Sequence, residues 1–232
     1  DDTAASDRRT TLCLANTDGA GTVTRLTRTG SVTAPRWSPD GDRLAFLGSR
    51  EGGDHGSVVD DLTEDDPRWT GSDPGEKTQL WVLDLAQGGD ATRVTGFPDG
   101  VQSFDWAPDG DRFVVAARDP SEEQAAMLRD RRDEDTPAPI EVTRLQHKVD
   151  GHGWTDEVET SLFVVDRETG ATDRLDDATA GRGLNAILTG PQPRWSPDGD
   201  RIAFLGNHTD AGDDTYVLDV YTVRPDGTDL RK

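Results

Sequence analysis

The sequence PRWSPDGDRLAFLG, at residues 35–48, returns at residues 193–206 as PRWSPDGDRIAFLG, with one position changed. A looser copy, SFDWAPDGDRFVV, occupies residues 103–115. Three copies within 232 residues form an internal repeat. A repeat of this kind indicates a fold built from similar units that pack on one another.

Each copy predicts a β-hairpin. Proline sets φ at the first corner of the turn, aspartate bonds the turn backbone, and glycine supplies a positive φ. The alternating apolar residues that follow predict a strand. We expect the tryptophan before each turn to lie on an inner face, packed against the neighbouring sheet. The residues that define the repeat are Trp37, Asp40, Gly41, Trp106, Asp109, Gly110, Trp195, Asp198 and Gly199.

A repeated hairpin with one tryptophan per unit is typical of a β-propeller blade. We therefore predict an all-β fold, an incomplete set of four-stranded blades belonging to a propeller of about six to eight blades. The expected hairpin strands are 31–37 with 43–47, 101–106 with 112–117, and 192–195 with 201–205. Expected outer strands are 79–85, 92–95, 161–166, 172–175 and 219–223.

The whole chain, 1–232, is predicted to be one partial propeller. It begins with a half blade at 11–30, followed by a blade at 31–96 that carries an insertion at 49–77. A second blade at 97–178 carries an insertion at 119–159, in which Ser121 is expected to cap a short helix. A nearly complete blade occupies 185–232. The insertions explain why the repeat tryptophans are 69 and 89 residues apart, when one blade needs about 40–45.

Charge excludes two classes of partner. The formal net charge is −21, from 46 acidic and 25 basic residues, whereas nucleic acids and anionic membranes require a basic face. Lysine occurs only at Lys77, Lys148 and Lys232. An acidic, lysine-poor surface resembles that of proteins adapted to high salt, where the Debye length shrinks to about 3 Å at 1 M and self-repulsion becomes tolerable.

Localisation is predicted from what the sequence lacks. Cys13 is the one cysteine, so the chain has no internal disulfide and a reducing compartment is favoured. We expect this residue to be a buried, small hydrophobic side chain in a strand. There is no signal peptide and no apolar run of about 18 residues. These features together predict a high-salt cytoplasm.

The sequence predicts no catalytic residue, metal or cofactor within this chain. There is no Gly-x-Ser-x-Gly nucleophile elbow and no glycine-rich phosphate loop. The four histidines, His55, His147, His152 and His208, have no metal-ligand spacing. Asp-Gly-Asp occurs in each repeat but lacks the ligand series of a calcium loop, so we interpret it as a hairpin turn. Trp69 and Trp154 lie in the insertions, where they either line a binding surface or anchor the insertion to the blades.

The repeat resembles that of TolB-like propellers and of the propeller domain of prolyl oligopeptidase-family serine peptidases. The more specific resemblance is at residues 140–154, IEVTRLQHKVDGHGW, and at 161–170, SLFVVDRETG. These stretches are similar to the acylaminoacyl- and dipeptidyl-peptidase branch of that family. The resemblance covers most of residues 11–232.

This resemblance implies that the chain is an N-terminal propeller that caps a C-terminal α/β-hydrolase domain of the same protein. The hydrolase domain would carry the Ser-Asp-His triad, and the propeller would restrict access to short peptides. The triad is absent from this chain, so the chain alone is expected to cleave nothing. No family substrate residue can be matched by motif. We expect the substrate-facing residues in the second insertion, at His147, Asp150, His152 and Trp154.

Two alternatives remain at this level. The first is a TolB-like propeller that binds proteins and has no enzymatic activity. A Gly-x-Ser-x-Gly nucleophile elbow in sequence beyond residue 232 would distinguish a peptidase from this alternative. The second is a propeller lyase, which requires a cluster of histidines and other metal ligands at the central channel. Four scattered histidines disfavour it.

Overall fold

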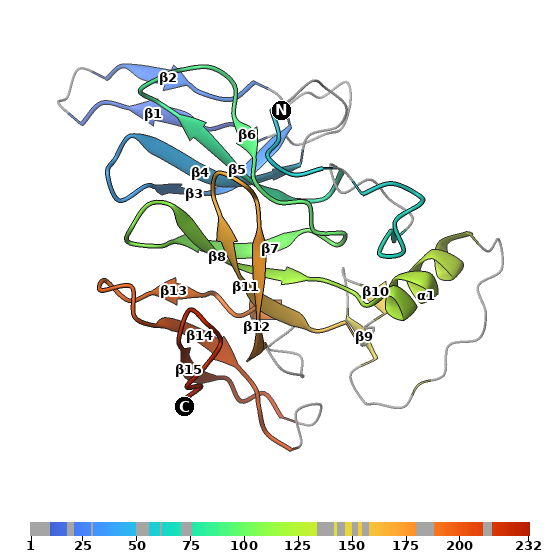
Figure 1. Cartoon of the computed structure of the whole chain (residues 1–232). Coiled ribbons are helices and arrows are strands. Elements are labelled where there is room, and N and C mark those ends of the chain that lie inside the picture. Colours follow the sequence, from blue (N-terminus) through green and yellow to red (C-terminus); the bar gives the residue numbers. More distant parts are fainter. Residues whose placement is uncertain are drawn as a thin grey trace.

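A computed structural model of the chain describes residues 10–17, 21–28, 30–49, 56–60, 62–70, 76–133, 142, 147–149, 153–154, 158–179, 188–210 and 215–232. These residues form antiparallel sheets stacked face to face, with one α-helix beside the stack (Figure 1). Within this part of the chain, no helical segment has the length and apolar character needed to cross a bilayer.

The first complete sheet has the strand order β3-β4-β5-β6. Its strands are β3 (Ser31–Trp37), β4 (Arg43–Ser49), β5 (Gln79–Asp84) and β6 (Thr92–Arg93). Residues 56–58 extend this sheet at its β6 edge, because Ser57 forms a parallel bridge with Arg93 of β6. The segment after β6 is held by the buried Gln79, whose side chain bonds the backbone N–H and carbonyl of Phe97 and the hydroxyl of Thr95.

The second complete sheet has the order β12-β11-β8-β7. Its strands are β7 (Val101–Trp106), β8 (Arg112–Arg118), β11 (Thr160–Asp166) and β12 (Thr172–Thr179). Helix α1 (Glu122–Asp133) and the short ribbon of β9 (Lys148–Val149) and β10 (Gly153–Trp154) lie between β8 and β11. Strand β12 runs beyond the expected residue 175, past a register shift opposite Ser161 and Leu162.

Smaller sheets flank these two. A hairpin of β1 (Cys13–Ala15) and β2 (Val23–Arg25) precedes the first sheet. The last sheet contains β13 (Arg194–Trp195), β14 (Ile202–Gly206) and β15 (Asp219–Val223), and Arg231 bridges to Thr222 beyond β15. Strand β13 is shorter than expected because Gln192 has φ of 45°, a left-handed conformation that a strand does not continue through.

Each central strand packs on both neighbouring sheets. In β8, Phe113, Val115 and Ala117 join a core shared with the first sheet. Val114 and Ala116 point the other way, into a core shared with β13, β14 and β15. The two-residue period of a strand therefore divides one apolar run between two interfaces, and β8 is buried along its whole middle.

The first strands of consecutive sheets contact one another, β3 with β7 and β7 with β13. The indole N–H of Trp106 donates to the Arg36 carbonyl at 3.3 Å, across the first of these interfaces. At the second, the backbone N–H of Trp195 donates to Oδ2 of Asp105 at 3.0 Å. Burial raises the pKa of Asp105, while the bond from Trp195 opposes this shift.

Two side chains that we expected to be buried are exposed in the structure. Trp106 and Trp195 are buried, but Trp37 is 50% exposed. It differs because the hairpin of β1 and β2 has only two short strands, which leave the outer face of β3 uncovered. Cys13 is also exposed, and the prediction that it is buried is wrong. Successive side chains of a strand point to opposite faces, so Cys13 faces away from the core that Leu12 joins. The buried residue of that hairpin is its neighbour, Leu12.

The repeated turns use aspartate and glycine as their residue types predict. Gly41, Gly110 and Gly199 have φ of 81°, 77° and 75°. In the first turn the Ser38 hydroxyl and the Asp42 backbone N–H both donate to Oδ1 of Asp40, at 2.5 and 3.1 Å. The third turn repeats this arrangement with Ser196, Asp198 and Asp200 in the corresponding places.

Tight turns and long connections leave opposite ends of the sheets. The hairpin turns β3–β4, β7–β8 and β13–β14 lie at one side in Figure 1, and α1 lies at the other. Antiparallel pairing requires this, because a chain that turns after its first strand must leave the second strand at the opposite end. The connections β4–β5, β8–β11 and β14–β15 therefore all begin at the same end, which we call the long-connection face.

Gly170 should be far less tolerant of a side chain than Gly199, although both have positive φ. A Cβ on Gly170 would lie 2.2 Å from Cγ1 of Val59 and 3.0 Å from the Val94 carbonyl oxygen, whereas the nearest atom to a Cβ on Gly199 is 3.9 Å away. Left-handed strain costs both Gly→Ala variants about 1–2 kcal/mol. We expect Gly170→Ala to lose about 1–3 kcal/mol more through overpacking. Guanidinium chloride unfolding of both variants measures this, and equal losses would contradict the packing described here.

Candidate functional site

Helix α1 begins at a capping box. The backbone N–H of Gln124 donates to Oγ of Ser121 at 3.2 Å, and Oε1 of Gln124 accepts the backbone N–H of Ser121 at 2.9 Å. These reciprocal bonds satisfy donors that a helix N-terminus otherwise leaves open. The expected helix with Ser121 as its N-cap is therefore present, and it places α1 directly after β8.

Two connections from different sheets meet at α1. The guanidinium of Arg129, on α1, donates from Nη1 to the Pro67 carbonyl at 3.2 Å and also to the Trp69 carbonyl. Pro67 and Trp69 belong to the connection between β4 and β5. Arg129 thus fastens the connection of the first sheet to that of the second, and the half-buried Trp69 lies at this junction.

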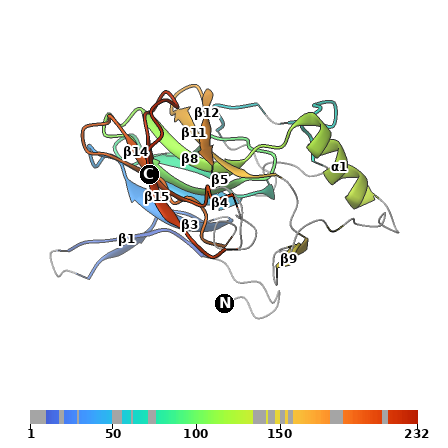
Figure 2. The same cartoon turned by 90° about the horizontal axis from the view of Figure 1, so that it is seen from below.

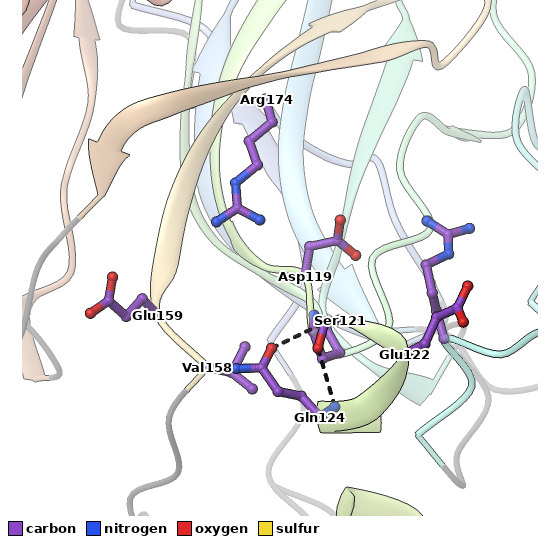
Figure 3. A pocket seen from close by; sticks show the side chains of 9 residues that line it. Asp119, Ser121, Glu122, Gln124, Val158, Glu159 and Arg174 are labelled. Carbon is purple, nitrogen blue, oxygen red and sulfur yellow. Dashed lines mark hydrogen bonds between the residues drawn. The ribbon is translucent and has the colours of Figure 1, made fainter. Parts of the chain in front are cut away.

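A cavity of about 690 Å³ opens beside the start of α1. It lies between the end of β8, the first turn of α1, the residues that lead into β11, and β12 (Figure 3). Its lining is mostly polar and of mixed charge. The lining residues are Arg68, Asp119, Pro120, Ser121, Glu122, Gln124, Val158, Glu159 and Arg174.

Asp119 is the side chain of this cavity with the most perturbed environment. Oδ1 of Asp119 is buried and has no hydrogen-bond partner among the described residues. Burial raises the pKa of Asp119, and the nearby Asp66 raises it further, whereas Arg68 and Arg174 act in the opposite direction. A half-buried carboxylate without a donor is costly in a folded protein and is typical of a functional site.

The two arginines of the cavity are held by other groups. Nη2 of Arg174 donates to Oγ of Ser161 at 3.0 Å, and its guanidinium lies 6.0 Å from the ring centre of Phe163. Nε of Arg68 lies 3.5 Å from Oδ1 of Asp66. Figure 3 shows the Arg174 guanidinium pointing toward Asp119 with no bond drawn between them.

The residues predicted to face a substrate are only partly within the described chain. His147 is described and half-buried, and the backbone of Trp154 pairs with Lys148 in the β9–β10 ribbon. Asp150 and His152 lie outside the described residues. His147 is not among the described residues that line the cavity. The ribbon and the cavity belong to the same connection between β8 and β11.

Sequence reasoning missed Asp119, although a local signal existed. Asp119 follows the apolar stretch Phe113–Ala117 and precedes the helix cap Ser121. A carboxylate in this position is expected at the edge of the core, where the strand ends. Its neighbours Arg68 and Arg174 have no such signal, because each comes from a different part of the chain. Among the described residues no group of three or more potential metal-ligating side chains occurs.

Comparison with known proteins points to one curated relative. No family model matches the sequence. The chain is 31% identical over 189 residues to the uncharacterized peptidase YuxL of Bacillus subtilis strain 168, which covers 82% of this chain and 24% of that protein. The chain thus spans about a quarter of the length of the curated relative that it matches.

Solved structures share the fold. Acylaminoacyl peptidase from Pyrococcus horikoshii is similar with a TM-score of 0.58 at 20% identity, over 95% of this chain and 27% of that chain. TolB from Acinetobacter baumannii is similar with a TM-score of 0.51 at 14% identity, over 96% of this chain and 37% of that chain. At these identities the likeness concerns the fold alone. With the stacked four-stranded sheets, it confirms the predicted all-β propeller architecture.

Replacing Asp119 with asparagine should stabilise the protein at neutral pH. The folded-state pKa is above the usual 3.8, so the wild type loses stability as pH rises from there through the folded pKa. Asp119→Asn has no such group and escapes this loss. We expect its melting temperature to exceed that of the wild type at pH 7, with the gap closing below about pH 3.

The control for this prediction is Asp130→Asn, at an exposed position farther along α1 that does not line the cavity. It should leave the melting temperature unchanged at either pH. If Asp119→Asn were less stable than the wild type at pH 7, the carboxylate would have a stabilising partner that contradicts this description.

Replacing Arg129 with methionine should loosen α1 without unfolding the sheets. The variant keeps an apolar stem and loses the two bonds to Pro67 and Trp69. Hydrogen bonds from a charged donor contribute about 1.5–3 kcal/mol, so amide hydrogens of α1 should exchange at least about tenfold faster. Exchange in β8 and β11, measured by mass spectrometry in the same experiment, should not change. Unchanged exchange in α1 would show that the helix is held by other contacts.

Proposed function

We propose that this chain is the propeller portion of a serine peptidase and that its long-connection face controls how short peptides reach an α/β-hydrolase domain of the same protein. The observation that carries the proposal is the gathering of α1, the cavity and the residue 62–70 segment at one end of the sheets. The likeness to a protein named as a peptidase supports it. In this proposal the hydrolase domain supplies the nucleophile, since the chain contains no Gly-x-Ser-x-Gly.

The architecture suits a cover of this kind. The sheet of β12, β11, β8 and β7 is rigid because it packs on a neighbouring sheet at each face, and the hairpin turns at the far end are short. The long connections can therefore differ in length without altering the core, as loops on a rigid scaffold commonly do. Arg129 holds two of these connections together, so they would face a second domain as one surface.

Within this proposal, His147, Asp150, His152 and Trp154 remain the candidate residues that face a peptide. The β9–β10 ribbon pairs Gly153 with Val149 and Trp154 with Lys148, so it projects as a short two-stranded element. An aromatic side chain on such a ribbon offers a large apolar contact for a peptide. No cofactor is required for hydrolysis by a serine nucleophile.

We further propose that the protein works in a high-salt cytoplasm. The net charge of −21 with only three lysines supports this. At molar salt the repulsion between surface carboxylates is screened, because the Debye length is then about 3 Å. Activity and melting temperature should therefore rise together as salt increases toward molar concentrations.

A serine-reactive fluorophosphonate probe, applied to the natural full-length protein at molar salt, tests the peptidase proposal. We expect labelling at a serine outside residues 1–232, and cleavage of chromogenic acyl-amino-acid or dipeptide substrates. Trp154→Ala should raise KM by about threefold to tenfold with little change in kcat, because it removes binding contact and no reacting group. Trp69→Ala, at the junction with α1, serves as the comparison.

Two other outcomes of the labelling and cleavage experiments would change this proposal. No labelled serine and no cleavage of any substrate would overturn the peptidase proposal. The TolB-like alternative, a propeller that binds proteins, would then account for the fold. Labelling with an unchanged KM in Trp154→Ala would keep the peptidase and remove the ribbon from substrate binding.

A further inference from the structure

The repeat tryptophans join successive sheets in two different ways. Between the first and second sheets, the indole N–H of Trp106 donates to the Arg36 carbonyl at 3.3 Å. Between the second and third sheets, the donor is instead the backbone N–H of Trp195, which donates to Oδ2 of Asp105 at 3.0 Å. Equivalent tryptophans therefore use different N–H groups to reach the first strand of the preceding sheet.

The residue before each tryptophan explains this difference. Arg36 precedes Trp37 and Asp105 precedes Trp106, so the two occupy the same place in the repeat. A guanidinium only donates hydrogen bonds, so the Arg36 side chain cannot accept the backbone N–H of the next tryptophan. A carboxylate accepts, and Asp105 takes the backbone N–H of Trp195. The side chain at this place thus decides which N–H group of the tryptophan is used.

The second interface leaves polar atoms without partners. Trp195 is 8% exposed, and its indole N–H has no hydrogen-bond partner among the described residues. Oγ of Ser103 is also buried without a described partner, and Ser103 lies on the same face of β7 as Asp105, two residues away. Buried donors of this kind are costly. The described position of the third sheet is therefore not the best one for every polar group at this interface.

A second position for the third sheet has its example within the molecule. If the third sheet met the second as the second meets the first, the Trp195 indole would donate to the Asp105 carbonyl, in the way that Trp106 donates to that of Arg36. The Asp105 carboxylate would then be released from the backbone N–H of Trp195. Each position satisfies one N–H group of Trp195 and frees the other.

Opposing effects at Asp105 bring the two positions close in free energy. Asp105 is half-buried, and burial raises its pKa although the bond from Trp195 acts in the other direction. The charged groups that act on it are Arg36 of β3 and Arg194 of β13, and its cross-strand neighbour on β8 is Val114. The bond to a charged acceptor favours the described position, and the burial of that charge disfavours it.

We propose that the third sheet, β13 to β15, moves between these two positions against the second sheet, and that the Asp105 carboxylate holds it in the described one. Packed interfaces change between discrete arrangements in this way. Residues 188–193 lead into β13 and residues 215–218 lead into β15. The movement therefore displaces these two parts of the long-connection face relative to α1. It does not depend on the function proposed above.

Fluorine NMR of the natural full-length protein, labelled with 5-fluorotryptophan, tests this at pH 7. Trp195→Phe and Trp106→Phe identify the two signals by their loss. We expect Trp195 to give two signals, the minor one at about 5–10% of the total, and Trp106 to give one. Spectra at several temperatures distinguish slow exchange, which gives two signals, from faster exchange, which gives one broadened signal.

Two substitutions should shift the populations in opposite directions. Asp105→Asn keeps an acceptor for the Trp195 N–H and has no charge to bury, so the minor signal should fall by at least about threefold. Asp105→Ala has no acceptor, so the minor signal should become the major one. In the wild type, the pKa of Asp105 is raised above 3.8 in the described position. Protonation therefore favours this position, and the minor signal should fall as the pH is lowered through that pKa.

The first interface supplies the matched control. Arg36→Asp places an acceptor at the equivalent position of β3, so Trp106 should acquire a second signal while Trp195 keeps both of its own. Arg36→Lys keeps the charge and has only donors, so Trp106 should keep a single signal.

Three results would overturn the proposal. One is a single, equally narrow Trp195 signal in the wild type and in both Asp105 variants. Another is a shift in the same direction in Asp105→Asn and Asp105→Ala, which would show that the carboxylate does not hold the sheet. The third is a second Trp106 signal in Arg36→Lys, which would show that no acceptor side chain is needed. The NMR signals require no activity, so failure to label a serine leaves this test valid.

Discussion

The structure depends on sheets that bury both faces. In β8, the side chains of Phe113 and Val115 pack on one neighbouring sheet and that of Val114 packs on the other. The apolar residues of this sheet are therefore buried only when a sheet covers each of its faces. This requirement brings the first strands of successive sheets together and seals them with Trp106 and Trp195. It also explains Trp37, whose face is covered only by the short hairpin of β1 and β2.

The same requirement separates the two ends of the sheets. One end has tight turns closed by aspartate and glycine, and in one of these turns Gly170 packs directly on Val59. At the other end the connections are long, polar and bound to one another by Arg129. The side chains at this end can change without loss of the core. Helix α1 and the short strand β9 lie there (Figures 1 and 2), and the cavity opens beside the start of α1.

The cavity shows what such an end can hold. Oδ1 of the half-buried Asp119 has no donor among the described residues, although two arginines are nearby. The arrangement works against stability, since the charged form of Asp119 is favoured more in the unfolded chain than in the folded one. Local conflicts of this kind in folded proteins are expected mainly at functional or strained sites. The large buried cores on both sides of β8 offset this loss of stability.

The sequence by itself determined the repeating unit of this protein. Turn chemistry and two-residue periodicity act over a few neighbouring residues, so the hairpins, the strand 101–106 and the cap at Ser121 were all predictable from local pattern. Only the tertiary structure decided which tryptophan is covered and where the charges meet. Arg68, Asp119 and Arg174 come from separate connections and strands, and their proximity follows from the stacking of whole sheets. No local sequence pattern predicts that these three residues lie near one another, because their proximity is set by contacts between residues far apart in the chain.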